Sequence, residues 1–381
     1  MASIYIHIPY CRQACYYCNF HFSTSLKTKN EMLEAISMEL AGRKNYLADE
    51  KIDTIYFGGG TPSLLETDEI KKIIETIGHN YNVNRDGLEI TLEANPDDLK
   101  INKINELYNA GINRLSIGVQ SFIDLELQTL HRVHNAEQSK RSILDAQQAG
   151  FDNITIDLIY GIQNQTDAMW LHNLDTLKSL NLPHFSAYAL TIEPKTAFEK
   201  MISLGKIAET DEDQAARQFL MLQEWAVSQN YLPYEISNYC KPGHFSRHNT
   251  GYWTGEKYLG IGPSAHSFNG ETRQWNVANN LKYINALNSG NPYFEIETLS
   301  ETNQFNEYIM TSLRTMWGCD LKYIETRFGL AFANAMKQTL EHYISDNLLF
   351  AEDNIIYLTM PGKLLADKII SGLFILNDND M

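Results

Sequence analysis

The chain of 381 residues has few cysteines, no excess of positive charge and no long apolar run. Its 31 Lys and Arg against 47 Asp and Glu give a formal net charge of −16, which opposes a polyanionic partner such as nucleic acid. The start, Met1-Ala2-Ser3, leads directly into a predicted strand, without the charged and apolar regions of a signal peptide. No later stretch approaches membrane-spanning length. We therefore expect a cytoplasmic protein, in a reducing compartment that keeps thiols free of disulfides.

Apolar, β-branched runs alternate with longer helical segments over the first half of the chain. With 44% hydrophobic residues, a chain of this length can build one large core and a smaller second one. Helical patterns such as residues 29–47 and 66–77 lie between strand patterns. Repeated strand–helix alternation predicts a parallel sheet with crossover helices, open or closed into a (β/α) barrel. The predicted strands are residues 4–8, 54–57, 88–92, 114–119, 153–159 and 185–190.

From about residue 301 this alternation stops. Three helical patterns, a short hairpin and a last helix follow, an order typical of a winged helix: residues 303–316, 321–328, 333–345, 353–354 for the hairpin turn, and 361–372. A winged helix can bind DNA, but the acidic composition favours a lid or docking module. We predict a barrel over residues 1–235, a linking segment over 236–300 and an α-rich, winged-helix-like domain over 301–381.

Three of the five cysteines fall within eight residues, as Cys11, Cys15 and Cys18, directly after the first predicted strand. Three thiolates this close can hold three irons of a [4Fe–4S] cube and leave the fourth iron without a protein ligand. The alternatives are inert buried thiols or a zinc site, although structural zinc normally takes four ligands and no second C-x2-C pair occurs. Cys240 and Cys319 stand alone and are expected in the core. The spacing resembles the radical S-adenosylmethionine (SAM) superfamily, in which the free iron binds SAM.

Polar residues and glycines follow or interrupt several of these strands. The Gly58-Gly59-Gly60 turn lets a backbone approach a ligand closely, or is simply a tight turn. Three polar side chains, Glu93, Gln120 and Asp157, end or interrupt apolar strands, where a polar group is costly unless it is hydrogen-bonded. A shared ligand or a neighbouring turn would satisfy them. Arg132 can offer a donor fork to a carboxylate ligand or lie solvated on a helix.

Five motifs together resemble the oxygen-independent coproporphyrinogen III oxidase family, from Ile4 almost to the C-terminus. They are Tyr5-Ile6-His7-Ile8-Pro9, the cysteine triplet, Phe57-Gly58-Gly59-Gly60-Thr61-Pro62-Ser63, Gly118-Val119-Gln120-Ser121-Phe122 and Tyr258-Leu259-Gly260-Ile261-Gly262. The resemblance implies a partial (β/α)6 radical SAM barrel. It also implies SAM contacts at Tyr5, Tyr17, Gly59, Gly60, Thr61, Glu93, Gln120, Arg132, Asp157, Ala189 and His266.

Two departures separate the chain from the decarboxylating oxidase. The oxidase is longer ahead of its cluster strand and carries a further cysteine two positions after the third, where this chain has Phe20. The segments around Cys18-Asn19-Phe20, His248-Asn249 and Gly262-Pro263 instead resemble the HemW branch, whose members are described as heme chaperones. This resemblance implies a [4Fe–4S] cluster, SAM and heme as cofactors, with heme handed to acceptor proteins.

A heme iron needs an axial His, Cys, Met or Tyr. Among the eleven histidines, His248 lies in a segment rich in aromatic residues and is our candidate ligand, the alternative being an ordinary aromatic core around a hydrogen-bonded histidine. The expected partners are then heme and heme-accepting proteins, which can lie at a membrane surface. A second copy of the chain, forming a homodimer, is a further possible partner, and nucleic acid is not expected. The alternative functions are oxidative decarboxylation of coproporphyrinogen III and, more remotely, an iron–sulfur DNA-binding regulator.

Overall fold

The computed structural model describes residues 2–375 and confirms all six predicted strands of the alternating half. These strands run parallel and pair in chain order. Parallel strands need crossover connections, which the intervening helices supply. The strands are β1 (Ala2–Ile8), β2 (Ile52–Gly59), β3 (Glu89–Ala94), β4 (Arg114–Gln120), β5 (Asn153–Tyr160) and β6 (His184–Ala189).

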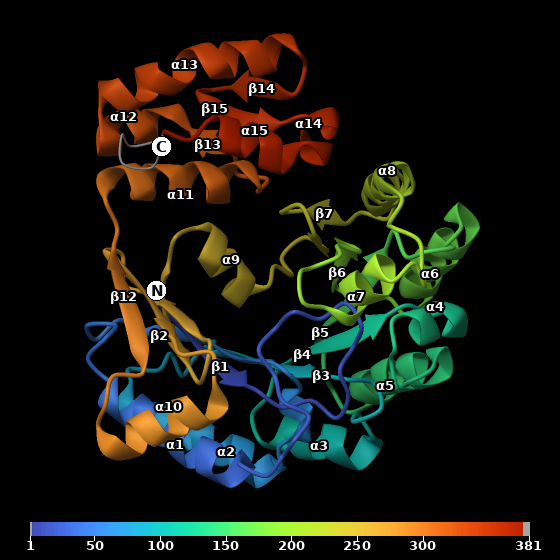
Figure 1. Ribbon diagram of the computed structural model, residues 1–381, viewed down its shortest axis with the longest axis vertical. Helices are drawn as coiled ribbons and strands as arrows, with labels where there is room; N and C mark the ends of the chain where they lie inside the picture. Colours follow the sequence, from blue (N-terminus) through green and yellow to red (C-terminus); the bar gives the residue numbers. More distant parts are fainter. Residues whose placement is uncertain (1, 376–381) are drawn as a thin grey trace.

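The crossover helices cover the outer side of this sheet (Figure 1). They begin and end where the sequence offers caps: Asn135 accepts from the backbone N–H of Gln138 at the start of α5, and Gly150 follows its end with a φ of 100°. The first helix ends at Gly42, earlier than predicted, and turns follow it. The helices are α1 (Lys29–Gly42), α2 (Thr67–Asn80), α3 (Ile101–Asn109), α4 (Asp124–Thr129), α5 (Ala136–Gln148) and α6 (Asp167–Ser179), with a 3-10 turn at Pro62–Leu64.

The two faces of the sheet differ in polarity. Along β5, Ile154, Ile156 and Leu158 belong to the main hydrophobic core, whereas Thr155 and Asp157 face a cavity on the other side. Side chains of a strand alternate between its faces, so one short sequence supplies both the core and the lining of a site. The core therefore lies between sheet and helices, and the concave side is left for function.

Residues 236–300, predicted to link two domains, contribute strands to the main sheet. β9 (Lys257–Ile261) pairs parallel with β1, and β10 (His266–Phe268), β11 (Thr272–Asn276) and β12 (Phe294–Thr298) extend that edge antiparallel. At the other edge lie β8 (Asn238–Cys240) and β7 (Leu232–Pro233). The division at residues 235 and 300 stays a prediction. The remaining helices are α7 (Ala197–Ser203), α8 (Glu212–Ser228), α9 (Arg247–Trp253) and α10 (Asn280–Ser289).

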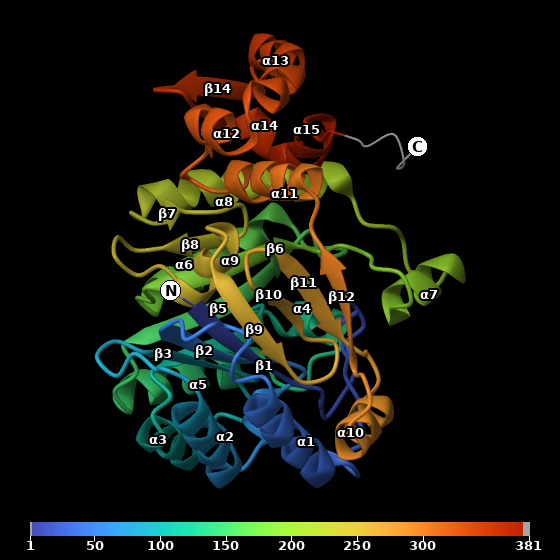
Figure 2. The ribbon, with the colours of Figure 1, turned by 90° about the vertical axis from the view of Figure 1, so that its left-hand side faces the viewer.

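The C-terminal part forms a lobe with a hydrophobic core of its own (Figures 1 and 2). It has the predicted order of three helices, a hairpin and a last helical segment, which is split in two. A strand of two residues adds to the hairpin. Within residues 2–375, no helix combines the length and apolar character needed to cross a membrane. The elements are α11 (Glu301–Leu313), β13 (Cys319–Asp320), α12 (Leu321–Phe328), α13 (Leu330–Ser345), β14 (Leu349–Glu352), β15 (Ile355–Leu358), α14 (Met360–Leu364) and α15 (Ala366–Gly372).

Candidate cofactor site

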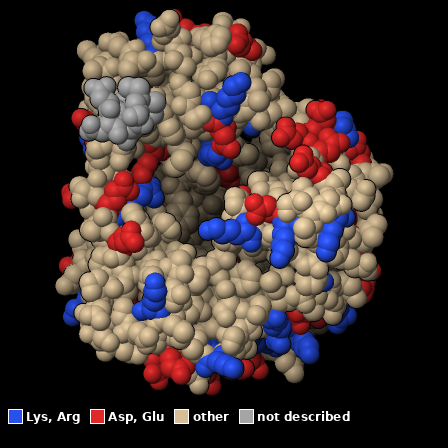
Figure 3. Space-filling model, viewed as in Figure 1, with Lys and Arg blue, Asp and Glu red and all other residues tan. Residues whose placement is uncertain are grey.

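A cavity of about 580 Å³ lies on the concave side of the sheet. The face seen in Figure 3 is hollowed at its centre. Except for His266, every residue predicted from the sequence to contact a cofactor or heme lines this cavity. The outlier lies on β10 with its ring tilted against Trp275, centroids 6.3 Å apart. A contact of His266 with SAM stays a prediction.

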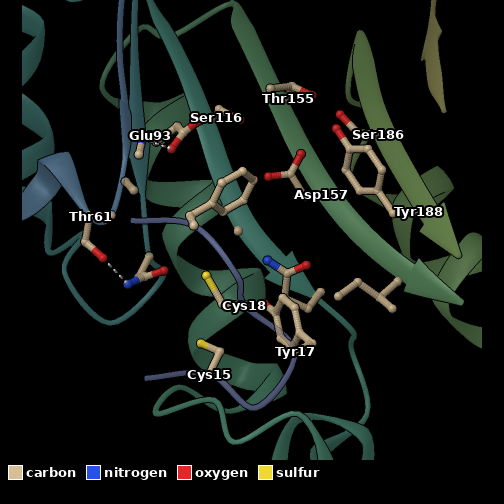
Figure 4. Close-up of a pocket in the computed structure, with 18 of the residues that line it drawn as sticks. Cys15, Tyr17, Cys18, Thr61, Glu93, Ser116, Thr155, Asp157, Ser186 and Tyr188 are labelled. Carbon is tan, nitrogen blue, oxygen red and sulfur yellow. Dashed lines mark hydrogen bonds between the residues drawn. The ribbon is translucent and has the colours of Figure 1, made fainter. Parts of the chain in front are cut away.

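Cys11, Cys15 and Cys18, the cluster cysteines, lie on the loop after β1 and are free thiols at the cavity wall. Burial raises the pKa of Cys11 to about 11, although Thr61 Oγ1 donates a hydrogen bond to its sulfur at 3.4 Å and opposes this rise. Figure 4 shows Cys15 and Cys18 on one side of the cavity and the labelled residues of β5 and β6 on the other. The other two cysteines, Cys240 and Cys319, are buried in the cores, as predicted.

Arg132 connects the cysteine loop to the strand ends. Its Nη1 donates to Cys15 Sγ and to Tyr17 Oη, both at 3.3 Å. Its Nη2 donates to Asn95 Oδ1 at 2.7 Å and to the Gly118 carbonyl at 2.8 Å. The side chain thus turns into the cavity instead of into solvent, and its positive charge lies beside a cluster cysteine. Such a charge stabilises thiolates and a negatively charged cluster.

The glycine turn is required by the approach of the cysteine loop. A Cβ on Gly59, whose φ is 105°, would lie 2.5 Å from His7 Nδ1, and a Cβ on Gly60 would lie 2.5 Å from the Tyr10 carbonyl oxygen. The Gly60 N–H donates to the Ile8 carbonyl at 2.9 Å. These glycines therefore let the turn pack closely on the end of β1 and the start of the cysteine loop, which is a reason for them that involves no ligand. Gly59, Gly60 and Thr61 also line the cavity, so their predicted SAM contact stays open.

Two partly buried carboxyl groups, Glu93 on β3 and Asp157 on β5, face the cavity. Burial raises the pKa of Glu93 to about 7; the nearby Asp157 adds to this, while a hydrogen bond from Tyr56 Oη at 2.8 Å opposes it. Burial likewise raises the pKa of Asp157 to about 6. Near neutral pH both groups therefore exchange protons readily, and a cationic ligand would favour their ionised forms.

Gln120 marks a distortion at the end of β4. Its φ is 67°, unusual for a residue with a side chain, and the pairing of β4 with β5 shifts register between Ile117 and Gln120. Its amide nitrogen folds back over Gly118, where an added Cβ would lie 3.0 Å away. Backbone strain of this kind clusters at functional sites, so it supports the predicted role independently of the sequence.

The aromatic contacts predicted for SAM lie on opposite walls. Tyr5 comes from β1 and packs on Tyr56 with ring centroids 6.0 Å apart. Tyr17 comes from the cysteine loop. Ala189 lies at the end of β6, the strand that also carries Tyr188 (Figure 4). The sheet thus brings together residues separated by nearly half of the chain.

His248, the heme-ligand candidate, is 2% exposed on α9 and borders the cavity. Its Nδ1 pairs with Thr54 Oγ1 at 2.6 Å and its Nε2 with Tyr252 Oη at 3.0 Å. Burial lowers its pKa to about 3, so the ring is neutral, the form that binds metals. Both nitrogens are engaged, and binding an iron would require one of these hydrogen bonds to be exchanged.

Sequence reasoning missed most of the polar lining of the cavity. For several of the missed residues on strands, the available signal is a polar residue two positions from another on the same apolar strand, which is the period of one face of a strand. Thr155 precedes Asp157 in this way, and Ser186 follows His184. The missed residues are Tyr56, Arg114, Ser116, Thr155, His184, Ser186, Tyr188 and Asn238.

The donor set suits a [4Fe–4S] cluster better than a single metal ion. Within residues 2–375, no three His, Cys, Asp or Glu side chains converge as one ion requires. The cluster cysteines instead line one cavity without disulfides, and the irons of a cube are themselves spread apart. Cys240 and Cys319 lie outside this lining, which leaves one iron open for a ligand from the cavity.

Comparisons with known proteins agree with this geometry. Residues 5–177 match the family described as the radical SAM superfamily, and residues 299–365 match the HemN C-terminal domain. The chain is 33% identical to the heme chaperone HemW of Bacillus subtilis, over 98% of this chain and 99% of that protein. It is 32% identical to HemW of Lactococcus lactis, over 99% and 98%. Coproporphyrinogen III oxidase (HemN) of Escherichia coli shares the fold, with a TM-score of 0.84 at 24% identity over 98% of this chain and 90% of that one.

Proposed function

The chain belongs to the HemW family within the radical SAM superfamily, and we propose that it binds heme and transfers it to acceptor proteins. The similarity to HemW of Bacillus subtilis extends over both chains almost completely, and this is the observation that carries the proposal. It includes the C-terminal lobe as well as the barrel. The acceptors we propose are heme-binding proteins, including ones at a membrane surface.

The cluster cysteines would hold a [4Fe–4S] cluster, and the residues around the open iron would hold SAM. When bound, the cluster supplies the electron that can cleave the SAM sulfonium. Arg132 donates a hydrogen bond to Cys15 Sγ and places a positive charge where a negatively charged cluster would be bound. Glu93, held by Tyr56 Oη, offers a carboxylate to a cationic group of SAM once the carboxyl loses its proton.

Phe20 supports the chaperone function over decarboxylation. The oxidase that the sequence resembles carries a further cysteine at this position. Here Phe20 is 67% exposed and borders the cavity. A phenyl ring can neither bind iron nor donate a proton, whereas it can lie against the flat apolar face of a macrocycle. The cavity mouth is thus equipped for contact with a macrocycle and lacks one thiol of the oxidase.

Heme titration tests the proposal. The reconstituted, oxygen-free protein should give a Soret shift that saturates at a fixed ratio of heme to chain. Replacement of His248 by Ala should weaken this shift if that histidine binds the iron. Because Tyr252 Oη would then lose its partner, Tyr252→Phe is the matched control: it removes the same hydrogen bond and keeps the imidazole. Absence of any saturable shift in the wild type would refute heme binding.

Oxidative decarboxylation of coproporphyrinogen III is the second candidate, because the fold matches the Escherichia coli oxidase over nearly the whole chain. That likeness concerns the fold alone. Product analysis after oxygen-free incubation with coproporphyrinogen III, SAM and a reductant separates the two functions. Protoporphyrinogen in more than one equivalent per chain would establish the oxidase.

A further inference from the structure

Arg114 is a buried cation without an anionic partner. It is the first residue of β4 and is 1% exposed. Its Nη1 donates to Asn153 Oδ1 on β5, while its Nε is buried and has no hydrogen-bond partner. Within residues 2–375 no carboxylate forms a salt bridge with it. Arginine is almost never fully buried unless it is paired, because removing a charge from water is costly.

The guanidinium borders the same cavity as the cluster cysteines. Among the described groups on which its charge acts, Asp157 is the one carboxyl, and no salt bridge joins the two. His184 pairs through both ring nitrogens, with Thr155 Oγ1 at 2.6 Å and Tyr234 Oη at 2.9 Å, and burial keeps it neutral. Asp157 lies two residues further along β5 than Thr155 and is within range of the Arg114 charge without contacting it. The guanidinium thus borders the cavity, and within residues 2–375 no carboxylate contacts it.

The place of Arg114 separates it from the predicted SAM contacts of β4 and of the cysteine loop. Parallel strands rise about 3.3 Å per residue, so Arg114 lies about 13 Å from Gly118, the residue of β4 whose carbonyl binds Arg132. The predicted SAM contacts of β4 and of the cysteine loop are at that far end, next to the open iron. An anion bound by Arg114 therefore belongs to a second molecule, or to a second part of a large one.

The residues that line the cavity indicate what kind of molecule would bind there. Tyr5, Tyr56 and His248 form one aromatic wall, with the rings of Tyr56 and His248 stacked at 4.9 Å. Tyr188 and Tyr252 border the cavity as well. Aromatic walls with a single buried cation suit a flat apolar ring system that carries carboxylates. We propose that Arg114 binds a propionate carboxylate of a tetrapyrrole at the inner end of the cavity; the assignment of that tetrapyrrole as heme rests on the proposed function.

The test compares heme with its dimethyl ester, in which both carboxylates are neutral. Titrations of the reconstituted wild type should show the ester binding at least about 30-fold more weakly, the effect of removing one partner of a buried charge pair. Arg114→Gln should bind heme as weakly as the wild type binds the ester and should lose nothing more toward the ester. Arg114→Lys should keep part of the preference. Arg217→Gln, which removes a surface charge paired with Asp167, is the control and should change nothing.

The outcomes separate the two proposals. Equal binding of heme and ester by the wild type overturns the role of Arg114 and leaves the chaperone function standing. This comparison needs no variant, so it decides the matter even if Arg114→Gln fails to fold. A preference for free carboxylates that appears with coproporphyrin III and not with heme supports the propionate site and overturns heme as its occupant. Failure of the wild type to bind either tetrapyrrole overturns both proposals.

Discussion

Replacing Glu93 by Gln should make the cofactor-free protein less sensitive to rising pH. Burial raises the pKa of this carboxyl from its usual 4.5 to about 7. Between these values the folded chain holds a proton that the unfolded chain has released. The free energy of unfolding therefore falls as pH rises from 4.5 to 7, and it levels off above the pKa of the folded state.

The size of this effect follows from the shift. One pKa unit corresponds to about 1.4 kcal/mol, so the ionised carboxyl destabilises the fold by about 3 kcal/mol at high pH. Between pH 5 and 8 the change is about 2 kcal/mol. Glu93→Gln lacks this ionisable carboxyl. The free energy of unfolding of the variant minus that of the wild type should therefore rise by about 2 kcal/mol from pH 5 to pH 8. Loss of the hydrogen bond from the Gly59 N–H shifts both ends of the window equally and does not affect the difference.

Urea unfolding of the iron-free protein at pH 5, 6, 7 and 8 measures this difference. Glu39→Gln is a matched control, because burial also raises the pKa of Glu39 to about 7 while that residue lies outside the cavity. Both variants should flatten the pH profile, but Glu93→Gln alone should weaken the effect of SAM on the EPR spectrum of the reduced cluster. Parallel stability curves for wild type and Glu93→Gln would refute the reasoning, as would an equal loss of the SAM response in Glu39→Gln.

Two further predictions concern the cysteine loop. Replacing any cluster cysteine by Ala should remove most of the four irons expected per reconstituted chain, whereas Cys240→Ala should keep them; iron analysis checks this, and full retention in a cluster variant would contradict the ligand assignment. Gly60→Ala should lower iron content and melting temperature together, because its Cβ would press on the Tyr10 carbonyl. The control is Gly78→Ala in α2, where nothing lies within 4 Å of the added Cβ; it should stabilise the folded protein by about 0.5–1 kcal/mol. Unaltered iron content in Gly60→Ala would show that the loop tolerates the side chain.

The features that sequence reasoning captured are those with a local signal. The strands around residues 54–57 and 153–159 read as apolar runs between turns, and parallel strands covered by helices require such runs. The cluster cysteines lie within eight residues, so their spacing alone places them on one loop. Gln120 and Arg132 were named as a polar end of an apolar strand and as a donor fork, and the structure adds a strained backbone at Gln120 and an inward turn of the Arg132 side chain.

What sequence reasoning missed depends on contacts between distant segments. The predicted SAM contact of the glycines stays a prediction, but sequence reasoning did not show that Gly59 packs on His7 of β1 and Gly60 on Tyr10 of the cysteine loop. β9 pairs with β1 across more than 250 residues, so its segment was predicted as a linker. The two hydrogen bonds of His248 depend in part on Thr54, far away in sequence. Arg114 is the first residue of a strand, a position where arginines are often exposed, and only the folded structure shows that it is buried.

The most direct test of the account is a comparison of heme binding with turnover in one preparation. Oxygen-free, reconstituted protein is divided, and one half is titrated with heme while the other is incubated with coproporphyrinogen III, SAM and a reductant. We predict a saturable Soret shift in the first half and no protoporphyrinogen in the second. Multiple-turnover formation of protoporphyrinogen would contradict the account.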